Sequence, residues 1–333
     1  MPLVTVVVPT LAADDAWEKC LGSLERQTFR DFEVTIVDNS ERGRVPAPKL
    51  PAWAKVLAPE RNVGFGEAIN LAARRSQSPF IATLNDDAEA EPGWLASLVE
   101  AGSACPQAGM FAAQVRLSEM ELDSAGMLLC ADGTSKQRGH LCPPAKFSQT
   151  GPALFPSGSA AMYRRELFDT LGGFEGSYFL YCEDTDLGLR ALWAGWECRY
   201  VADAVVYHRY SHSVGRVSPL KAYLVERNRL FTVLRTFPLR MLAVVPLFTF
   251  MRYFWHAVSL VTGTGAAGQF RKQGTSPLWL LWFVVKSRLS LVTRLPQLLA
   301  QRRQIRKTAR ISAREWINTV SEHAISVKEV ASL

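Results

Sequence analysis

Short runs of β-branched and aromatic residues alternate with longer amphipathic stretches through the first 100 residues. Apolar runs of this length are typical of buried strands, whereas stretches with a 3.6-residue period are typical of helices. The predicted strands are Val4 to Val8, Phe32 to Val37, Trp53 to Ala58 and Phe80 to Leu84, and the predicted helices begin near Asp14 and Gly66. This alternation predicts an α/β fold with a mainly parallel sheet and helices on its faces.

Polar residues follow three of these strands, at Pro9-Thr10, Asp38-Asn39-Ser40 and Asn85-Asp86-Asp87. Ligands of open α/β sheets bind beyond the carboxyl ends of the strands. We therefore expect the three groups to converge on one crevice.

The pattern is less regular between residues 105 and 160, where we expect a strand near Met110 to Val115 and a mobile stretch from Asp132 to Gly151. A helix from Glu183 to Trp193 and a strand from Cys198 to Val206 follow. This assignment places His208 in the loop after the strand.

Charge divides the chain into an acidic body and a basic remainder. Residues 1 to 214 carry 19 Lys and Arg against 27 Asp and Glu, a balance of −8, and residues 215 to 333 carry 19 against 4, a balance of +15. The two balances sum to the net charge of +7. We expect one domain over residues 1–230 and a basic, amphipathic helical region over residues 231–333.

Long uncharged runs occupy Met241 to Met251, Tyr253 to Phe270 and Gln273 to Val285. The longest, Tyr253 to Phe270, contains His256 and several glycines and falls short of the roughly 20 predominantly apolar residues of a spanning helix. Tryptophan and arginine within these runs favour helices that lie in a membrane interface. No nucleic-acid recognition motif is present, so we expect a lipid surface and no nucleic acid as the partner of this region.

The six cysteines are scattered, without a Cys-x-x-Cys pair or a zinc-like spacing, which indicates reduced thiols in a cytosolic protein. The N-terminal run lacks the positive flank and cleavage site of a signal peptide, and it is interpreted as a buried strand.

Two acidic clusters are the candidate chemical groups. A short acidic motif such as Asn85-Asp86-Asp87 at a strand end holds a hard divalent cation and a diphosphate, or it caps a turn. In the second cluster, Glu183-Asp184-Thr185-Asp186, helical spacing puts Glu183 and Asp186 near one face and Asp184 elsewhere. Such a cluster supplies a general base, or all of its carboxylates complement the helix N-terminus. His208 is a metal ligand or a structural histidine, and His212 competes with it for the metal role.

Several motifs in order resemble the family 2 glycosyltransferases. They are Val7 to Thr10, Val37 to Ser40, Arg61 to Gly66 with Asn70, Leu84 to Asp87, and Gly172 to Arg190. The resemblance covers residues 3 to about 230 and is greatest to bacterial rhamnosyltransferases of cell-surface polysaccharide synthesis. It implies the GT-A (nucleotide-diphospho-sugar transferase) fold and an inverting, metal-dependent hexosyl transfer.

The resemblance also implies roles for individual residues. The donor nucleotide would be bound by Pro9, Thr10, Asp38, Asn62, Gly66, Asn70, Asn85 and Asp86, with Asp38 on the pyrimidine and Asp86 on the ribose or diphosphate. Mg²⁺ or Mn²⁺ would be held by Asp87 and His208, the acceptor by Gly158 and Glu183, and Asp184 would be the catalytic base. Many members have Asp where this chain has Asn85, so the metal site is expected to depend more on Asp87 and His208.

The expected donor is dTDP-rhamnose, with UDP-galactose or UDP-galactofuranose as alternatives. The expected acceptor is a polyprenyl-diphosphate-linked glycan at the inner face of the cell membrane, with the enzyme peripherally attached on the cytoplasmic side. A processive synthase would show a Gln-x-x-Arg-Trp motif and several spanning helices, and this chain shows neither. An inactive nucleotide-binding scaffold is disfavoured by the presence of Asp87, Asp184 and His208.

Overall fold

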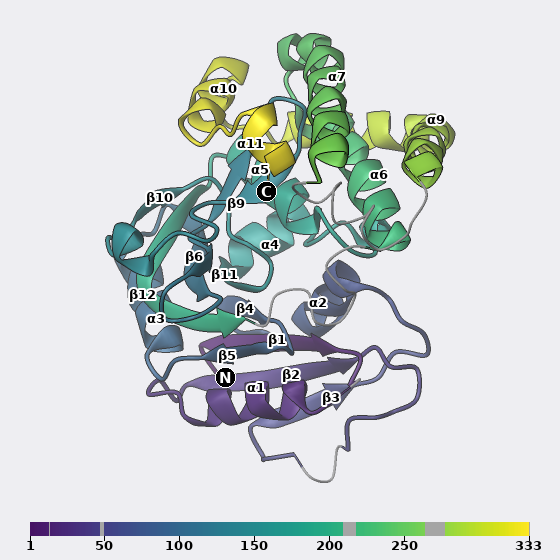
Figure 1. Cartoon of the computed structure of the whole chain (residues 1–333). Helices are drawn as coiled ribbons and strands as arrows, with labels where there is room; N and C mark the ends of the chain where they lie inside the picture. Colours follow the sequence, from purple (N-terminus) through teal and green to yellow (C-terminus); the bar gives the residue numbers. More distant parts are fainter. Residues whose placement is uncertain (13, 47–49, 209–217, 264–276, 333) are drawn as a thin grey trace. The chain divides into compact units, whose positions relative to one another are not determined.

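The computed structural model describes residues 1–12, 14–46, 50–208, 218–263 and 277–332 (Figure 1). The chain divides into two compact units. The first comprises Met1–Met127, Gln137–Ala191 and Trp196–Ser213, and the second comprises Leu128–Lys136, Leu192–Gly195 and Val214–Leu333. The boundary expected at residues 230 and 231 therefore falls inside helix α6 (Pro219–Thr236) of the second unit.

A mixed sheet forms the centre of the first unit, with the strand order β10-β12-β6-β11-β4-β1-β2-β3 (Figure 1). Strand β5 pairs with β12, and β7 pairs with β6. The strands are β1 (Val4–Thr10), β2 (Phe32–Asp38), β3 (Ala54–Leu57), β4 (Phe80–Leu84), β5 (Ala88–Ala90), β6 (Ala108–Arg116), β7 (Leu122–Ser124), β10 (Gly151–Ala153), β11 (Ala160–Arg164) and β12 (Glu197–His208).

The first four strands are parallel, as the βαβ pattern predicted. Strand β11 then enters antiparallel between β4 and β6, while β6 and β12 are parallel to each other. The predicted α/β class is confirmed, and the later strands make the sheet mixed.

Alternate residues of β1 point to opposite faces of the sheet, and different helices cover the two faces. Val4, Val6 and Val8 belong to the same buried cluster as α1 (Ala16–Glu25) and α3 (Trp94–Ala104), which contributes the fully buried Trp94. Helix α2 (Phe65–Arg74) packs against β1 and β2 from outside this cluster, and α4 (Arg165–Leu171) packs against β11. Because successive strand residues point to opposite faces, a strand covered on both sides is apolar throughout.

Two expectations are corrected within the first unit. The loop assignment of His208 was wrong, because β12 continues to His208 and pairs it with Ala88 of β5. The stretch from Asp132 to Gly151 contains regular elements, namely β9 (Ser135–Gln137) and a 3₁₀ turn η2 (Pro144–Phe147), before β10 begins at Gly151.

The second unit is mainly helical, with α6 packed along α9 (Pro277–Lys307) and α7 (Leu239–Thr262) packed against α11 (Val327–Ser332). Helix α10 (Ala313–Glu322) contributes the fully buried Trp316, which stacks on Trp193 at a centroid distance of 5.7 Å. The guanidinium of Arg306 lies 3.5 Å from the ring centroid of Trp193.

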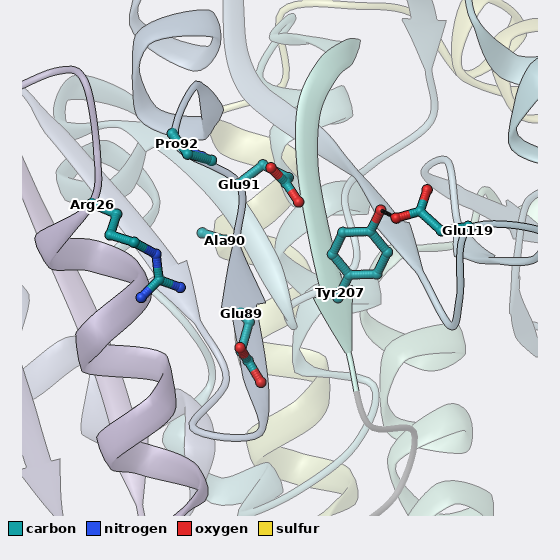
Figure 2. A pocket seen from close by; sticks show the side chains of 7 residues that line it. All are labelled: Arg26, Glu89, Ala90, Glu91, Pro92, Glu119 and Tyr207. Carbon is teal, nitrogen blue, oxygen red and sulfur yellow. Dashed lines mark hydrogen bonds between the residues drawn. The ribbon is translucent and has the colours of Figure 1, made fainter.

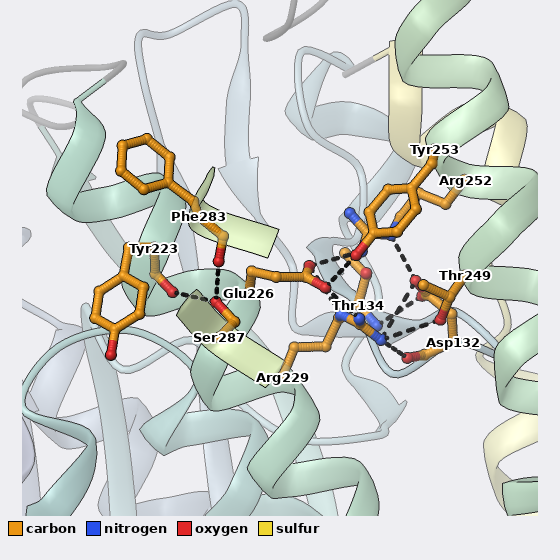
Figure 3. A network of polar contacts seen from close by, with 10 residues as sticks. All are labelled: Asp132, Thr134, Tyr223, Glu226, Arg229, Thr249, Arg252, Tyr253, Phe283 and Ser287. Carbon is orange, nitrogen blue, oxygen red and sulfur yellow. Dashed lines mark hydrogen bonds and ion pairs between the residues drawn. The ribbon is translucent and has the colours of Figure 1, made fainter. Parts of the chain in front are cut away.

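A buried ion cluster joins α6, α7 and the segment before β9 (Figure 3). Arg252 Nε lies 2.5 Å from Asp132 Oδ2, and Arg252 Nη2 lies 2.7 Å from Glu226 Oε2. Arg229 Nη2 lies 2.6 Å from Glu226 Oε1, and the Tyr253 hydroxyl donates to the same oxygen. The sequence interpretation treated Arg252 as a break between two uncharged runs, but α7 passes through it because these carboxylates neutralise its charge.

Candidate active site

The three polar groups expected to converge at the strand ends are in contact in the first unit. Strands β1, β2 and β4 are adjacent and parallel, so their carboxyl ends lie at one edge of the sheet. The Thr10 hydroxyl at the end of β1 donates to Asp86 Oδ2 at 2.6 Å. Burial raises the pKa of Asp86, and the hydrogen bond from Thr10 opposes that rise. Two residues expected at the donor site are thereby in direct contact.

Asp38 ends β2 and organises the loop that follows it. Its carboxylate accepts hydrogen bonds from the backbone nitrogens of Ser40 at 2.9 Å and Val45 at 3.0 Å. Burial favours the neutral acid, but hydrogen bonds from Ser40 and Val45 outweigh it and lower the pKa of Asp38. The residue is therefore a buried carboxylate that fixes the loop after β2.

The loop before α2 is built around Gly64. The side-chain oxygen of Asn62 accepts from the backbone nitrogen of Gly64 at 2.9 Å, and Asn39 donates to the Gly64 carbonyl at 3.3 Å. Gly64 has φ +80°, and a Cβ added there would lie 2.1 Å from the Phe179 carbonyl oxygen. Only glycine fits this close approach. The motif containing Asn62 is thus held against the segment that precedes Asp184.

Gly66 and Asn70 are buried packing residues in this structure. A Cβ at Gly66 would lie 2.9 Å from Phe174 Cβ. The Asn70 side chain accepts from the Phe174 nitrogen at 2.9 Å and donates to its carbonyl at 2.8 Å, with a further bond to Glu67. The amide of Asn70 therefore holds the Phe174 backbone, and its expected contact with the nucleotide stays a prediction. Pro9 is partly exposed next to Thr10.

The two expected metal ligands face each other. His208 Nε2 lies 3.1 Å from Asp87 Oδ1 and 3.2 Å from Asn85 Nδ2. Two ligands of one hard cation, each about 2.1 Å from it, lie at a comparable separation. The pair therefore fits Mg²⁺ or Mn²⁺ when diphosphate oxygens complete the coordination. No cluster of three or more metal-ligating side chains is present among the described residues.

His208 is enclosed between carboxylates. Burial disfavours its charged form, but hydrogen bonds to Asp123 and Asp87 outweigh that effect and raise its pKa to about 9. His208 Nδ1 lies 3.1 Å from Asp123 Oδ2. The sequence interpretation missed Asp123, and nothing local to its Leu-Asp-Ser segment signals the contact. The competing His212 lies outside the described residues.

Asp184 stands at the start of α5 (Glu183–Trp193), where the helix prediction is confirmed at both ends. Its Oδ2 accepts from the backbone nitrogen of Gly158 at 3.1 Å and its Oδ1 from that of Thr185 at 2.6 Å. Burial raises the pKa of Asp184 against these hydrogen bonds. Burial and the neighbouring Asp184 raise the pKa of Glu183 to about 8, and Glu183 Oε2 has no hydrogen-bond partner among the described residues.

Backbone strain is concentrated immediately before this helix. Phe179, Tyr181 and Cys182 have φ values of +68°, +72° and +65°, a left-handed region that residues with a Cβ adopt at a cost in free energy.

Asp186 has a structural role, because Arg190 Nε donates to its carboxylate at 2.7 Å and Arg190 Nη2 donates to the Gly173 carbonyl at 2.7 Å. The salt bridge anchors the glycine turn to α5.

A separate pocket lies beside β5 and β12, lined by Arg26, Glu89, Ala90, Glu91, Pro92, Glu119 and Tyr207 (Figure 2). The Tyr207 hydroxyl donates to Glu119 there. None of the predicted site residues lines this pocket.

The family models identify the chain as a glycosyltransferase. Residues 5–172 match the model described as Glycosyl transferase family 2, and residues 145–292 match the one described as Glycosyl transferase family group 2. The chain belongs to glycosyl transferase family 2.

Within that family, the chain resembles rhamnosyltransferases. The N-acetylglucosaminyl-diphospho-decaprenol L-rhamnosyltransferase of Mycobacterium tuberculosis is 29% identical over 240 residues, which cover 64% of this chain and 78% of that protein. The O-antigen chain rhamnosyltransferase WbaN of Salmonella anatum is 24% identical over 221 residues, covering 64% and 68%. These similarities agree with the resemblance found in the motifs.

Solved structures confirm the expected fold. GalNAc-T7 with UDP, GalNAc and Mn²⁺ matches with a TM-score of 0.56 and 16% identity, over 70% of this chain and 48% of that one. The mannosyltransferase PcManGT from Pyrobaculum calidifontis, in complex with GDP-Man and Mn²⁺, matches with a TM-score of 0.54 and 17% identity, over 88% and 86%.

Proposed function

We propose that this glycosyltransferase moves L-rhamnose from dTDP-rhamnose to a polyprenyl-diphosphate-linked glycan in surface polysaccharide synthesis, with inversion at the anomeric carbon. The observation that carries the proposal is that the two acidic clusters form hydrogen bonds to two adjacent residues, Gly158 and Ser159. Asp184 accepts from the Gly158 nitrogen, and the next residue, Ser159, accepts through its carbonyl from the Asn85 nitrogen at 2.9 Å. The base and the diphosphate-binding motif are thus fixed to one short segment. The sugar donor is supported by the rhamnosyltransferase relatives.

In this proposal the donor nucleotide lies along the strand ends, with Thr10, Asp38 and Asn62 at its base and ribose and Asp86 towards the diphosphate. Asp87 and His208 would hold Mg²⁺ or Mn²⁺, which when bound would neutralise charge on the leaving diphosphate. Asn85 contacts His208 in place of a third carboxylate, which leaves Asp87 and His208 as the principal protein ligands.

Asp184 is the proposed general base. It removes the proton from the attacking acceptor hydroxyl, and the oxygen then displaces the diphosphate from the opposite face of the sugar, which inverts the anomeric carbon. The Gly158 and Thr185 nitrogens fix the orientation of this carboxylate. Its raised pKa makes it a stronger base than an exposed aspartate. Gly158 and Glu183 would then border the acceptor.

The second unit supports a lipid-linked acceptor, because helix α7 buries polar residues and exposes apolar ones. Its buried positions include Thr249, Arg252 and Ser259. Every exposed residue between positions 241 and 261 is apolar: Ala243, Val244, Pro246, Leu247, Phe250, Met251, Phe254, Ala257 and Val261. A soluble protein shows the opposite arrangement, with its polar face outward.

Helix α9 adds a mixed surface to the same unit. It exposes the apolar residues Trp282, Leu289 and Val292 together with the cations Lys286 and Arg288. Apolar and basic residues on exposed helices fit an anionic bilayer surface. Helix α7 is also long and apolar enough to cross a bilayer by length and composition, which is weak support by itself. We therefore propose that the second unit attaches the enzyme peripherally to the cytoplasmic face of the membrane.

The test is a transfer assay with purified protein, Mn²⁺ or Mg²⁺ and a short-chain polyprenyl-diphosphate acceptor carrying N-acetylglucosamine. dTDP-rhamnose is compared with UDP-galactose and UDP-galactofuranose, and product stereochemistry is read by NMR. We expect transfer from dTDP-rhamnose with inversion. Faster transfer from a UDP-sugar would reject the donor, and binding without transfer of any sugar would reject catalysis.

The metal assignment is tested with Asp87→Ala. Donor binding by this variant should lose its dependence on Mn²⁺, as measured by calorimetry with dTDP in the presence and absence of metal. The matched control is Glu100→Ala, which removes an exposed carboxylate from α3 of the same unit. Mn²⁺ dependence equal to wild type in Asp87→Ala would remove this residue from the coordination shell.

A further inference from the structure

Both ring nitrogens of His208 are held by carboxylates. Nε2 lies 3.1 Å from Asp87 Oδ1, and Nδ1 lies 3.1 Å from Asp123 Oδ2. The Asp123 residue is 2% exposed. The ring is therefore fixed in rotation, and its two nitrogens face two different carboxylates.

Asp123 lies at a register shift in a strand pair, between Ser124, which pairs with Val115, and Leu122, which pairs with Arg116. It is the middle residue of β7, which pairs with β6, and β6 pairs in parallel with β12, the strand that ends at His208. Strands β7 and β12 both pair with β6, so one sheet carries the carboxylate and the histidine and holds their separation. The contact is thus a product of the sheet and does not depend on a flexible loop.

A second histidine lies on the far side of Asp123. His140 Nδ1 lies 3.2 Å from the backbone oxygen of Asp123 and 3.3 Å from Oδ1 of its side chain, and the first of these contacts has hydrogen-bond geometry. Asp123 therefore lies between two imidazoles, with its carboxylate facing His208 and its backbone oxygen facing His140.

We propose that Asp123 is a positioning residue for metal binding: it accepts the Nδ1 proton of His208 and leaves the Nε2 lone pair directed at the cation, with His140 supporting Asp123 from behind. An imidazole binds metal through one nitrogen while the other donates its proton, and a carboxylate acceptor fixes the tautomer and increases the basicity of the ligand. This inference rests on the proposed metal role of Asp87 and His208.

The alternative for Asp123 is a purely structural ion pair with a histidinium. That pair would stabilise the fold without any preference for which nitrogen of His208 faces Asp87. The two roles differ in metal affinity and in the coordination of nitrogen to the metal, and both quantities are measurable without turnover.

The test titrates full-length protein with Mn²⁺ in the presence of dTDP and follows free Mn²⁺ by electron paramagnetic resonance. The ¹⁴N coupling of bound Mn²⁺ is recorded by electron spin-echo envelope modulation. Asp123→Asn should weaken Mn²⁺ binding by about 10- to 100-fold and reduce the nitrogen coupling, the range typical of such supporting groups. His140→Leu, which leaves the carboxylate in place, should weaken binding about three- to tenfold by the same reasoning.

Asp203→Asn is the matched control, because Asp203 is an exposed aspartate on the same strand as His208, and it should bind Mn²⁺ like wild type. The proposal would be overturned if both variants fold and show the Mn²⁺ affinity and nitrogen coupling of wild type. If Asp123→Asn does not fold, the result for His140→Leu alone tests the proposal. His208→Ala separates the two levels. If His208→Ala loses the coupling while the Asp123 and His140 variants retain it, only the positioning role fails; if His208→Ala also binds like wild type, the metal site itself is wrongly assigned.

Discussion

The backbone nitrogen of Gly158 donates a hydrogen bond to Oδ2 of Asp184 at 3.1 Å. Gly158 also accepts through its carbonyl from the Thr83 hydroxyl at 3.0 Å, at the end of strand β4. One residue therefore links the carboxylate of the second acidic cluster to the strand that carries the first. This link joins two groups that lie about 100 positions apart in the chain.

Replacement of Asp184 by Asn should remove transfer while donor binding persists. The amide keeps the size of the side chain but accepts no proton, and loss of a general base typically lowers the rate about 10²- to 10⁴-fold. The measurements are turnover with saturating donor and acceptor and, separately, dTDP affinity. Asp169→Asn, an exposed aspartate on α4, is the control. Equal loss of binding and turnover in Asp184→Asn would indicate a structural role instead.

Gly64→Ala should destabilise the first unit far more than Gly43→Ala. Both glycines have positive φ, at +80° and +58°, so both substitutions carry backbone strain. A Cβ at Gly64 meets the Phe179 carbonyl at 2.1 Å, whereas nothing lies within 4 Å of one at Gly43. We expect a loss of about 3 kcal/mol or more at Gly64 and about 1 kcal/mol at Gly43 in urea unfolding. Similar losses at the two positions would contradict the packing of this loop.

The ion cluster should make the second unit sensitive to acid. Burial favours the neutral forms of Asp132 and Glu226, but Arg252 and Arg229 outweigh it and lower both pKa values. A carboxylate with a lowered folded-state pKa stabilises the fold above its unfolded value of about 4, and this contribution is lost as the pH falls below it. Thermal unfolding followed between pH 7 and pH 3 should therefore show a steep loss of stability on the acid side.

Glu226→Gln tests the same cluster at neutral pH. It leaves Arg229 and Arg252 with less compensating charge, and removal of one partner from a buried ion pair typically costs about 3 to 5 kcal/mol. Glu322→Gln, at an exposed position of α10, provides the comparison and should change the free energy of unfolding by less than about 0.5 kcal/mol. A small effect in both variants would show that the cluster contributes little to stability.

The outward face of α7 should determine membrane binding. Phe250 is 70% exposed and Phe254 is 55% exposed. Insertion of each ring into a bilayer is worth about 1.5 to 3 kcal/mol, so Phe250→Ser with Phe254→Ser should weaken binding to anionic vesicles by at least about 100-fold in a flotation assay. Met120→Ser, which changes a 73% exposed apolar residue of the first unit, should leave vesicle binding unchanged. Unaltered flotation of the double variant would exclude this face as the contact.

Much of the first unit follows from local patterns. The strand Phe80–Leu84 and the helix Glu183–Trp193 begin and end where their apolar runs and polar flanks predicted. The two acidic clusters were also evident in the sequence, because each is a short run of neighbouring residues. The end of β12 was misplaced, since pairing with β5 extends the strand through His208, and such pairing has no local signal.

The sequence by itself determined the alternation of strands and helices up to Leu84, the helix Glu183–Trp193, the two acidic clusters, the family and the change from an acidic body to a basic, apolar remainder. Those features depend on local period, composition and motif, which neighbouring residues define. Only the tertiary structure decided that β11 enters antiparallel beside β4, that Asn70 holds Phe174, and that Asp123 faces His208. Each of these depends on contacts between residues far apart in the chain, where strand pairing and side-chain packing select the partner.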